Sequence, residues 1–289
     1  MYTIQNNQLK VTINPTGAEL SSIYDKIKQR EYLWSGDAKF WGKTSPVLFP
    51  IVGALKNNTY LFDGNSYELS RHGFAREMDF EVTRQTSTSL TFTLQNNEAT
   101  LKVFPFYFSL SLIYTIEEKS LSVTYLVNNT GSEKMYFSVG AHPAFKLPLA
   151  DGLAYDDYYL LFNKVENAGR WPISKDGLIE MNAAPLLTDT DRLPLTKELF
   201  YKDAVVFKNL QSDEMQLKSG RHTAGFSFTF KGFPYLGIWA AKDAPFVCIE
   251  PWCGIADSVN TNQQMTEKEG IIALNAGDNF ERTWGVTLF

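Results

Sequence analysis

Two histidines and a glutamate are the residues of this chain best suited to acid–base chemistry. The 289 residues include only three histidines, and two of them, His72 in "SRHGFAR" and His142 in "GAHPAF", lie beside Gly, Pro and aromatic residues. We expect both at strand ends, where a sheet holds a side chain and leaves it accessible. Glu250 in "FVCIEPWCG" ends an apolar stretch, and burial of a carboxyl group raises its pKa. A paired acid and base of this kind suits an isomerisation.

The remaining polar candidates favour structural roles. His222 in "GRHTAG" lies in a polar stretch between glycines, and we interpret it as a surface turn residue. Asp203 in "YKDAVVF" has the setting of a turn carboxylate when it is taken alone. The histidine spacing matches no compact metal motif, and the two cysteines lie far away in sequence, so no metal site is expected.

Composition restricts the class of protein and of partner. Hydrophobic residues make up 44% of the chain and aromatics 14%, which excludes disorder. The net charge of -5 provides no basic stripe for a nucleic acid. The chain contains no run of 18 apolar residues, so no membrane partner is expected. Cys248 and Cys253 are too few for a disulfide framework, and the first residues do not resemble a signal peptide, so we expect a cytoplasmic protein.

Alternation of apolar and polar residues predicts an all-β fold. Two stretches, 235–241 and 246–252, are more continuously apolar than the others and are expected to be buried on both faces. Helical periodicity is limited to short turns near Asp37 and Thr196, and residues 151–196 read as long loops. No repeat of fixed period is present, so residues 1–289 are predicted to form one domain. The alternating segments lie at 9–13, 90–94, 121–127, 215–217 and 226–230.

Three motifs in order resemble the aldose 1-epimerase (galactose mutarotase) family, in particular its LacX-like bacterial branch. They are "SPVLFPIVGALKNNTYLFDGNSYELSRHGFAR", "VGAHPAF" and "FVCIEPWCGIAD", and the resemblance covers nearly the whole chain. It implies a β-supersandwich of large antiparallel sheets with a sugar bound in an open cleft. The implied reaction interconverts the α and β anomers of a hexose and needs no cofactor.

The resemblance also implies roles for individual residues. His142 matches the histidine that protonates the ring oxygen, and Glu250 matches the glutamate that takes the proton of the anomeric hydroxyl. His72 matches the histidine that binds the sugar beside the reacting centre. Asp203 matches, more loosely, the aspartate that binds sugar hydroxyls. These matches predict His142, Glu250 and His72 as catalytic residues.

One position departs from the family pattern. The chain has Ala54 where these enzymes carry a substrate-binding arginine. Arg71 or Arg76, on either side of "HGFA", is expected to supply a guanidinium to the same cleft, and Lys56 is a further candidate. Sugar specificity therefore stays open.

Two other functions are compatible with the sequence. A hexose-6-phosphate 1-epimerase would need clustered Arg or Lys side chains for the phosphate. A non-catalytic carbohydrate-binding or sensing protein would use Phe104, Trp239 and Trp252 as stacking platforms. The paired histidines and Glu250 favour the enzyme, because a binder needs no matched acid and base. In each case the expected partner is a small sugar or sugar phosphate, and monomer and homodimer both stay open.

Overall fold

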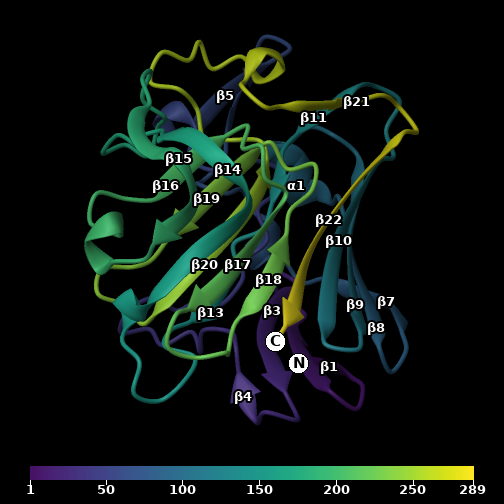
Figure 1. Cartoon of the computed structure of the whole chain (residues 1–289). Helices are drawn as coiled ribbons and strands as arrows, with labels where there is room; N and C mark the ends of the chain where they lie inside the picture. The colour runs from purple at the N-terminus through teal and green to yellow at the C-terminus, as the bar shows by residue number, and fades with distance from the viewer.

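Antiparallel β-sheet makes up almost all of the regular structure in the computed structural model, which describes residues 1–289 (Figure 1). The largest sheet has nine strands. In spatial order they are β15 (Ala184–Pro194), β14 (Tyr158–Arg170), β17 (Glu214–Ser219), β18 (Phe226–Thr229), β22 (Asn279–Leu288), β10 (Ser120–Asn129), β9 (Phe108–Glu117), β8 (Ser89–Gln95) and β7 (Glu81–Gln85).

A second sheet of five strands lies in the left half of the view in Figure 1. Its strand β20 (Phe246–Cys253) pairs on one side with β19 (Tyr235–Trp239), which pairs in turn with β16 (Val205–Lys208). On its other side β20 pairs with two short strands in succession, β12 (Val139–Gly140) and β13 (Ala144–Lys146).

Smaller elements complete the chain. One sheet contains β1 (Tyr2–Gln5), β2 (Leu9–Asn14), β3 (Glu19–Asp25) and β4 (Arg30–Glu31); two pairs join β5 (Thr59–Phe62) with β6 (Asn65–Glu68) and β11 (Met135–Phe137) with β21 (Ile272–Leu274). The one α-helix is α1 (Glu98–Val103). Short 3₁₀ turns are η1 (Lys56–Asn58), η2 (Ala75–Glu77), η3 (Tyr155–Asp157), η4 (Lys197–Phe200) and η5 (Met265–Glu267). None of the helices is both long enough and apolar enough to cross a membrane.

The nine-stranded and five-stranded sheets pack through aromatic side chains. Phe145 of β13 lies 4.3 Å, centroid to centroid, from Phe226 of β18, and Phe162 of β14 lies 6.2 Å from Phe207 of β16. These rings belong to a core of 71 buried residues. Because one face of the five-stranded sheet fills this core, only its opposite face is available for a ligand.

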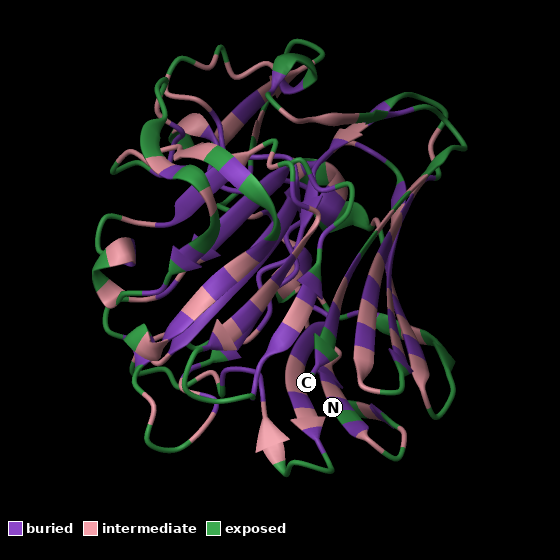
Figure 2. Ribbon diagram, viewed as in Figure 1, coloured by how far each residue is buried: buried purple, intermediate pink, exposed green.

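The opposite face of the five-stranded sheet carries a second, smaller apolar cluster. On β16, Val205 and Phe207 point into the main core, and Val206 points into this second cluster of nine buried residues. Figure 2 shows the strands of this sheet as almost continuously buried, whereas the outer strands alternate. The expectation that residues 235–241 and 246–252 are buried on both faces is thus largely confirmed, with Trp239 and Ala241 partly exposed.

The all-β prediction is confirmed, with two local corrections. The prediction of long loops at residues 151–196 is wrong. This segment contains β14 and β15, the two longest strands of the chain. The apolar alternation fails there because β15 is an edge strand with mostly exposed side chains, and its pairing with β14 shifts register at three places. Near Thr196 the expected helical turn is η4, but the segment near Asp37 forms only a turn in which Phe40 and Trp41 donate to the Asp37 carbonyl.

Candidate active site

A cleft of about 570 Å³ opens on the face of the five-stranded sheet that is turned away from the main core. All six residues predicted for the site line it, although they come from separate parts of the chain. The volume is that of a small-molecule pocket. Their individual roles stay predictions; the residues are His72, His142, Glu250, Arg71, Arg76 and Asp203.

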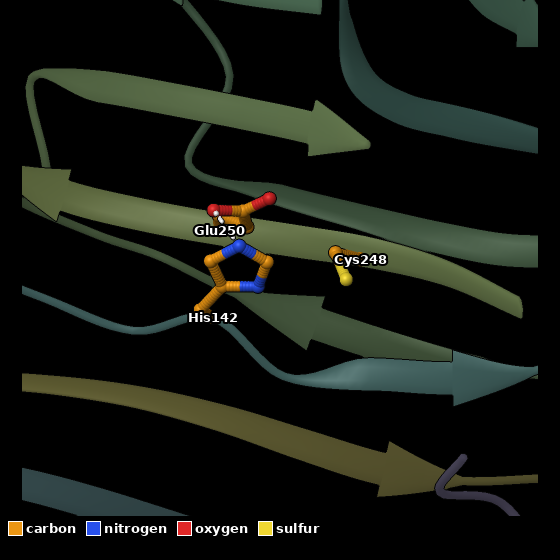
Figure 3. Close-up of side chains that lie close together, drawn as sticks. All are labelled: His142, Cys248 and Glu250. Atoms are coloured by element: carbon orange, nitrogen blue, oxygen red, sulfur yellow. Dashed lines mark ion pairs between the residues drawn. The ribbon is translucent and has the colours of Figure 1, made fainter. Parts of the chain in front are cut away.

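Strand pairing brings His142 and Glu250 together. Val139 of β12 pairs with Cys253, and Ala144 of β13 pairs with Cys248. Both pairs keep one register, and continuing it places His142 opposite Glu250. The distance from His142 Nε2 to Glu250 Oε2 is 3.2 Å, and the two side chains are 10% and 2% exposed (Figure 3).

Pro143 interrupts the pairing of this strand without ending it. Because it has no N–H, Pro143 cannot donate to β20, but its carbonyl accepts from Ile249 N, and Ala141 N donates to Pro251 O. The strand therefore stops at Gly140 and resumes at Ala144 in the same register. The sequence had suggested that the strand ends at His142; instead, His142 lies in a gap between two aligned strands.

Two tryptophans enclose the His142 ring. Trp41 stacks on it with ring centroids 4.9 Å apart and planes 30° apart, and Trp239 meets it edge-on at 5.6 Å. Trp41 was missed as a site residue because it lies in a turn without strand or helix periodicity. Its aromatic type next to Gly42 was the only signal available. The stack excludes water from the imidazole and fixes its orientation.

His72 faces the same centre from the "HG" turn. Its ring lies 5.8 Å from that of His142, nearly perpendicular. Gly53 N donates to His72 Nδ1 at 3.1 Å, and His72 N donates to Gly53 O at 2.9 Å. Because Nδ1 accepts a hydrogen bond, the neutral ring carries its proton on Nε2. His72 is thereby held as a donor, which is the form that suits binding of a sugar oxygen.

Burial shifts the pKa values of His142, His72 and Glu250 in the directions that favour their neutral forms. It lowers the pKa of His142 to about 3, and the positive charges of Arg76 and Arg71 act in the same direction. Burial, together with the neighbouring His142, lowers the pKa of His72 well below its usual value. Burial also raises the pKa of Glu250 well above its usual value, while Arg71 partly opposes that shift. The expected rise for Glu250 is confirmed, and in the free protein burial favours the neutral form of His142.

Arg71 occupies the surroundings of Ala54. A side chain on Gly177 would lie 2.9 Å from Arg71 Nη2 and 3.2 Å from the Ala54 Cβ, so the guanidinium and the alanine lie close to each other. Arg71 makes no hydrogen bond or ion pair with the protein. Arg76 also lines the cleft, but its Nε lies 3.6 Å from Glu77 Oε1. The expectation that an arginine reaches the cleft is confirmed, and Arg71 is the freer of the two.

The structure also places the remaining candidates, some of them differently from the sequence interpretation. Lys56 does not line the cleft, because its Nζ donates to the Val259 carbonyl at 3.1 Å. Lys242, which sequence reasoning missed, lines it instead. Phe104 is fully buried among core phenylalanines and is wrong as a stacking platform. His222 is exposed and outside the cleft, as expected for a turn residue.

Asp203 is held by its own loop. Arg170 donates to the carbonyls of Leu199, Asp203 and Ala204, which fixes the backbone around it. The residue has φ 98°, in the left-handed region, and its Oδ1 accepts from Ala204 N at 2.7 Å. The carboxylate therefore combines a turn role with a position on the cleft wall.

Trp252 contributes a buried donor to the cleft. Its ring passes over Gly140 of β12 and Gly237 of β19, where a Cβ would lie 2.7 Å and 2.5 Å from indole carbons. The two glycines thus allow the ring to lie flat across the neighbouring strands. Its buried Nε1 lies beside Glu250 and acts on that carboxyl as a hydrogen-bond donor, which opposes part of the rise in the Glu250 pKa.

Fold and site together define a protein of packed antiparallel sheets with a buried histidine–glutamate pair in a small-molecule cleft, and comparison with known proteins identifies its family. The family described as "Aldose 1-epimerase" matches residues 1–284. The chromosomal and plasmid forms of "Protein LacX" from Lactococcus lactis subsp. lactis are each 31% identical over 294 residues, covering 99% of this chain and 98% of theirs. The chain therefore belongs to the aldose 1-epimerase family.

Solved structures support the same assignment. A galactose mutarotase related enzyme from Lactobacillus acidophilus is 35% identical, with a TM-score of 0.95 over 100% of this chain and 97% of that one. A galactose mutarotase-like protein from Lactobacillus casei is 34% identical, with a TM-score of 0.94 and full coverage of both chains. A putative aldose 1-epimerase from Escherichia coli K12, at 18% identity and a TM-score of 0.73 over 100% of this chain and 98% of that one, shares the fold.

The pKa shifts predict how the histidines titrate. In long-range ¹H–¹⁵N spectra of the labelled protein, His142 and His72 should keep the signals of neutral rings as pH falls from 7 to 5, because protonation would place a charge in the buried cluster. His72 should show the tautomer with its proton on Nε2. Protonation of either ring in this range would contradict the buried geometry, and exposed His222 provides a reference signal.

Proposed function

We propose that this protein is an aldose 1-epimerase that interconverts the anomers of a hexose by opening and closing its ring. The single observation that carries the proposal is the 3.2 Å contact between His142 Nε2 and Glu250 Oε2 inside the cleft. The reaction must remove a proton from one sugar oxygen and deliver one to another. An acid and a base at this separation can serve the two oxygens on C1 at once.

The proposed reaction conserves protons at every step. Glu250 takes the proton of the anomeric hydroxyl, His142 donates its proton to the ring oxygen, and the C1–O5 bond breaks as the C1 carbonyl forms. Rotation about C1–C2 presents the other carbonyl face. In ring closure, His142 takes the proton of the O5 hydroxyl and Glu250 returns its own to the carbonyl oxygen. One positioned acid or base contributes roughly 10²- to 10⁴-fold to such a step.

Burial favours the protonation state that ring opening produces. After opening, Glu250 is a neutral acid and His142 a neutral base, which are the forms that the pKa shifts favour. Before opening, the same single proton sits on His142 and leaves Glu250 ionised. Because the free pair is neutral, its proton must first move from Glu250 to His142, and the return of the pair to its neutral form as the C1–O5 bond breaks recovers the cost of that transfer.

The active pair holds one proton, so activity should be greatest between its two macroscopic pKa values. Burial of both groups sets the order of the two steps in the free protein. Toward acid, a second proton is gained by His142 as pH approaches about 3, and toward alkali the last proton leaves Glu250, whose pKa is raised.

A purely sugar-binding protein fits these residues less well. Trp41 and Trp239 could stack on a sugar ring, but they pack against His142 and shield it. Stacking alone gives no reason to bury a carboxyl group against an imidazole, because an unpaired or poorly solvated acid destabilises the fold. The paired groups therefore favour an enzyme.

Replacement of Glu250 by Gln tests the proposed function. Glu250→Gln keeps the side-chain shape and removes the base, so anomer interconversion should fall by about 10²-fold or more while sugar binding is largely retained. Polarimetry or exchange NMR measures the interconversion of glucose, galactose and their 6-phosphates. Glu166→Gln is the matched control, because Glu166 is equally buried but lies outside the cleft. Unchanged turnover in Glu250→Gln on every accepted sugar would show that the assigned base is wrong.

A hexose 6-phosphate is a second candidate substrate class. Arg71, Arg76 and Lys242 all line the cleft, and Arg71 has no protein partner. A guanidinium free of internal partners is suited to bind a phosphate in bidentate fashion. The same arginine could bind the hydroxyls of a free hexose, as the resemblance implies for the missing arginine at Ala54.

Arg71→Met separates the two substrate classes. If Arg71 binds a phosphate, kcat/KM should fall by about 10-fold or more for the 6-phosphate and change much less for the free hexose. If it binds hydroxyls, both substrates should lose activity to a similar degree. Equal activity of the variant and the parent on both substrates would remove Arg71 from the binding site. Arg192→Met is the control, because Arg192 lies outside the cleft, beside the Tyr159 ring.

A further inference from the structure

A lysine and an aspartate form a buried ion pair beside one wall of the cleft, and the proposed reaction uses neither. Lys268 Nζ lies 2.8 Å from Asp257 Oδ1, and each side chain is only 3% exposed. Lys268 Nζ also donates to the Ile255 carbonyl at 2.6 Å. Between these two partners lies Ala256, which lines the cleft, whereas Lys268 and Asp257 do not.

Stability alone does not explain why this pair is buried. Burial deprives Lys268 of water and lowers its pKa, and the carboxylate of Asp257 opposes that shift. An apolar pair of similar volume often stabilises a fold at least as well as a buried ion pair. What the ion pair adds is directional hydrogen bonds, which fix the segment 255–257 in one position.

Asp257 holds two further stretches of chain at the cleft wall. Its N–H donates to the Ala54 carbonyl at 2.9 Å, and its Oδ2 accepts from Lys56 N at 2.9 Å. Its own carbonyl accepts from Ile179 N at 2.8 Å, and Ile179 lines the cleft. The residue that Lys268 anchors therefore connects three segments that are distant in sequence.

The anchored segment packs against the peptide that orients His72. Gly53 N donates to His72 Nδ1 at 3.1 Å. A Cβ on Gly53 would lie 2.7 Å from the Ala256 Cα, so the two backbones are in direct contact. A displacement of the segment 255–257 would move Gly53 and weaken the hydrogen bond that fixes the His72 tautomer.

The bond to Ile179 extends the same support to Arg71. Ile173 and Ile179 form a β-bridge, and Gly177 lies in the turn between them. A Cβ on Gly177 would lie 2.9 Å from Arg71 Nη2. Because Arg71 has no hydrogen-bond partner in the protein, contact with this turn restricts where its guanidinium can lie.

We propose that the Lys268–Asp257 ion pair positions His72 and Arg71 for sugar binding. The effect on sugar binding rests on the proposed function, but the effect on the His72 ring does not. The acid–base pair itself is positioned by the register of β20 with β12 and β13. Loss of the ion pair therefore acts on substrate binding more than on proton transfer.

The His72 ring provides a direct readout of the positioning. Lys268→Met removes two hydrogen bonds from the anchored segment, so long-range ¹H–¹⁵N spectra should show His72 exchanging between its two tautomers. The His142 signals should stay those of the parent. Lys268→Met alone leaves a buried carboxylate unpaired, which destabilises the fold. The double variant Asp257→Asn/Lys268→Met leaves no unpaired charge, and its new amide oxygen can still accept from Lys56 N.

Kinetics separate positioning from a general loss of stability. In the double variant, KM for the sugar should rise by about 10-fold while kcat changes much less, because the displaced groups bind the sugar. Glu166→Gln is the matched control, since Glu166 is buried and accepts from Gln211 N and Ser212 N outside the cleft. This control should keep the parental KM and the parental His72 spectrum, and circular dichroism checks the fold of each variant.

The outcomes distinguish this proposal from the proposed function. A folded double variant with the parental His72 tautomer would overturn the positioning role, and so would a changed tautomer with a parental KM. If the parent protein interconverts no sugar and His72 still changes in the double variant, the positioning of the ring is retained and the proposed function is rejected.

Discussion

The position of the reacting groups depends on one register, that between β20 and the interrupted strand formed by β12 and β13. Val139 and Ala144 pair with β20 in the same alignment on either side of the gap, so His142 falls opposite Glu250. A shift of one residue would turn Glu250 into the main core and leave His142 without a partner. Pairing of β20 with β19 on its other side stabilises the same alignment.

The protein around this register keeps the pair out of water. One face of the sheet fills the main core, and on the other face Trp41 and Trp239 close around His142. Trp252 lies flat beside Glu250 only because the strands on both sides carry glycine where its ring passes. As a direct result the pKa of His142 falls and that of Glu250 rises, so both side chains favour their neutral forms, and these shifts link the packing to the proposed ring opening.

The sequence predicted the fold and most of the site because both leave periodic or motif signals. Strands with one buried face alternate clearly, as at 121–127, and β20 is apolar except for Glu250 and buried throughout. The β14–β15 hairpin was missed because an exposed edge strand with shifted register needs no alternation. Trp41 and Lys242 were missed because each lies in a turn or loop, where only the folded chain shows what lies nearby. The strength of the shift in the His142 pKa could not be predicted for the same reason, since the rings that bury it come from distant segments.

The central claim is that His142 and Glu250 act as one proton-transferring unit, and a double-mutant cycle tests it most directly. Exchange NMR would measure the rate of anomer interconversion for the parent, His142→Asn, Glu250→Gln and the double variant. Groups that act as a unit show non-additive losses, so the double variant should retain about the same residual rate as either single variant. Losses that multiply, with the double variant slower by the product of the two single effects, would show that the groups act independently and would contradict the account.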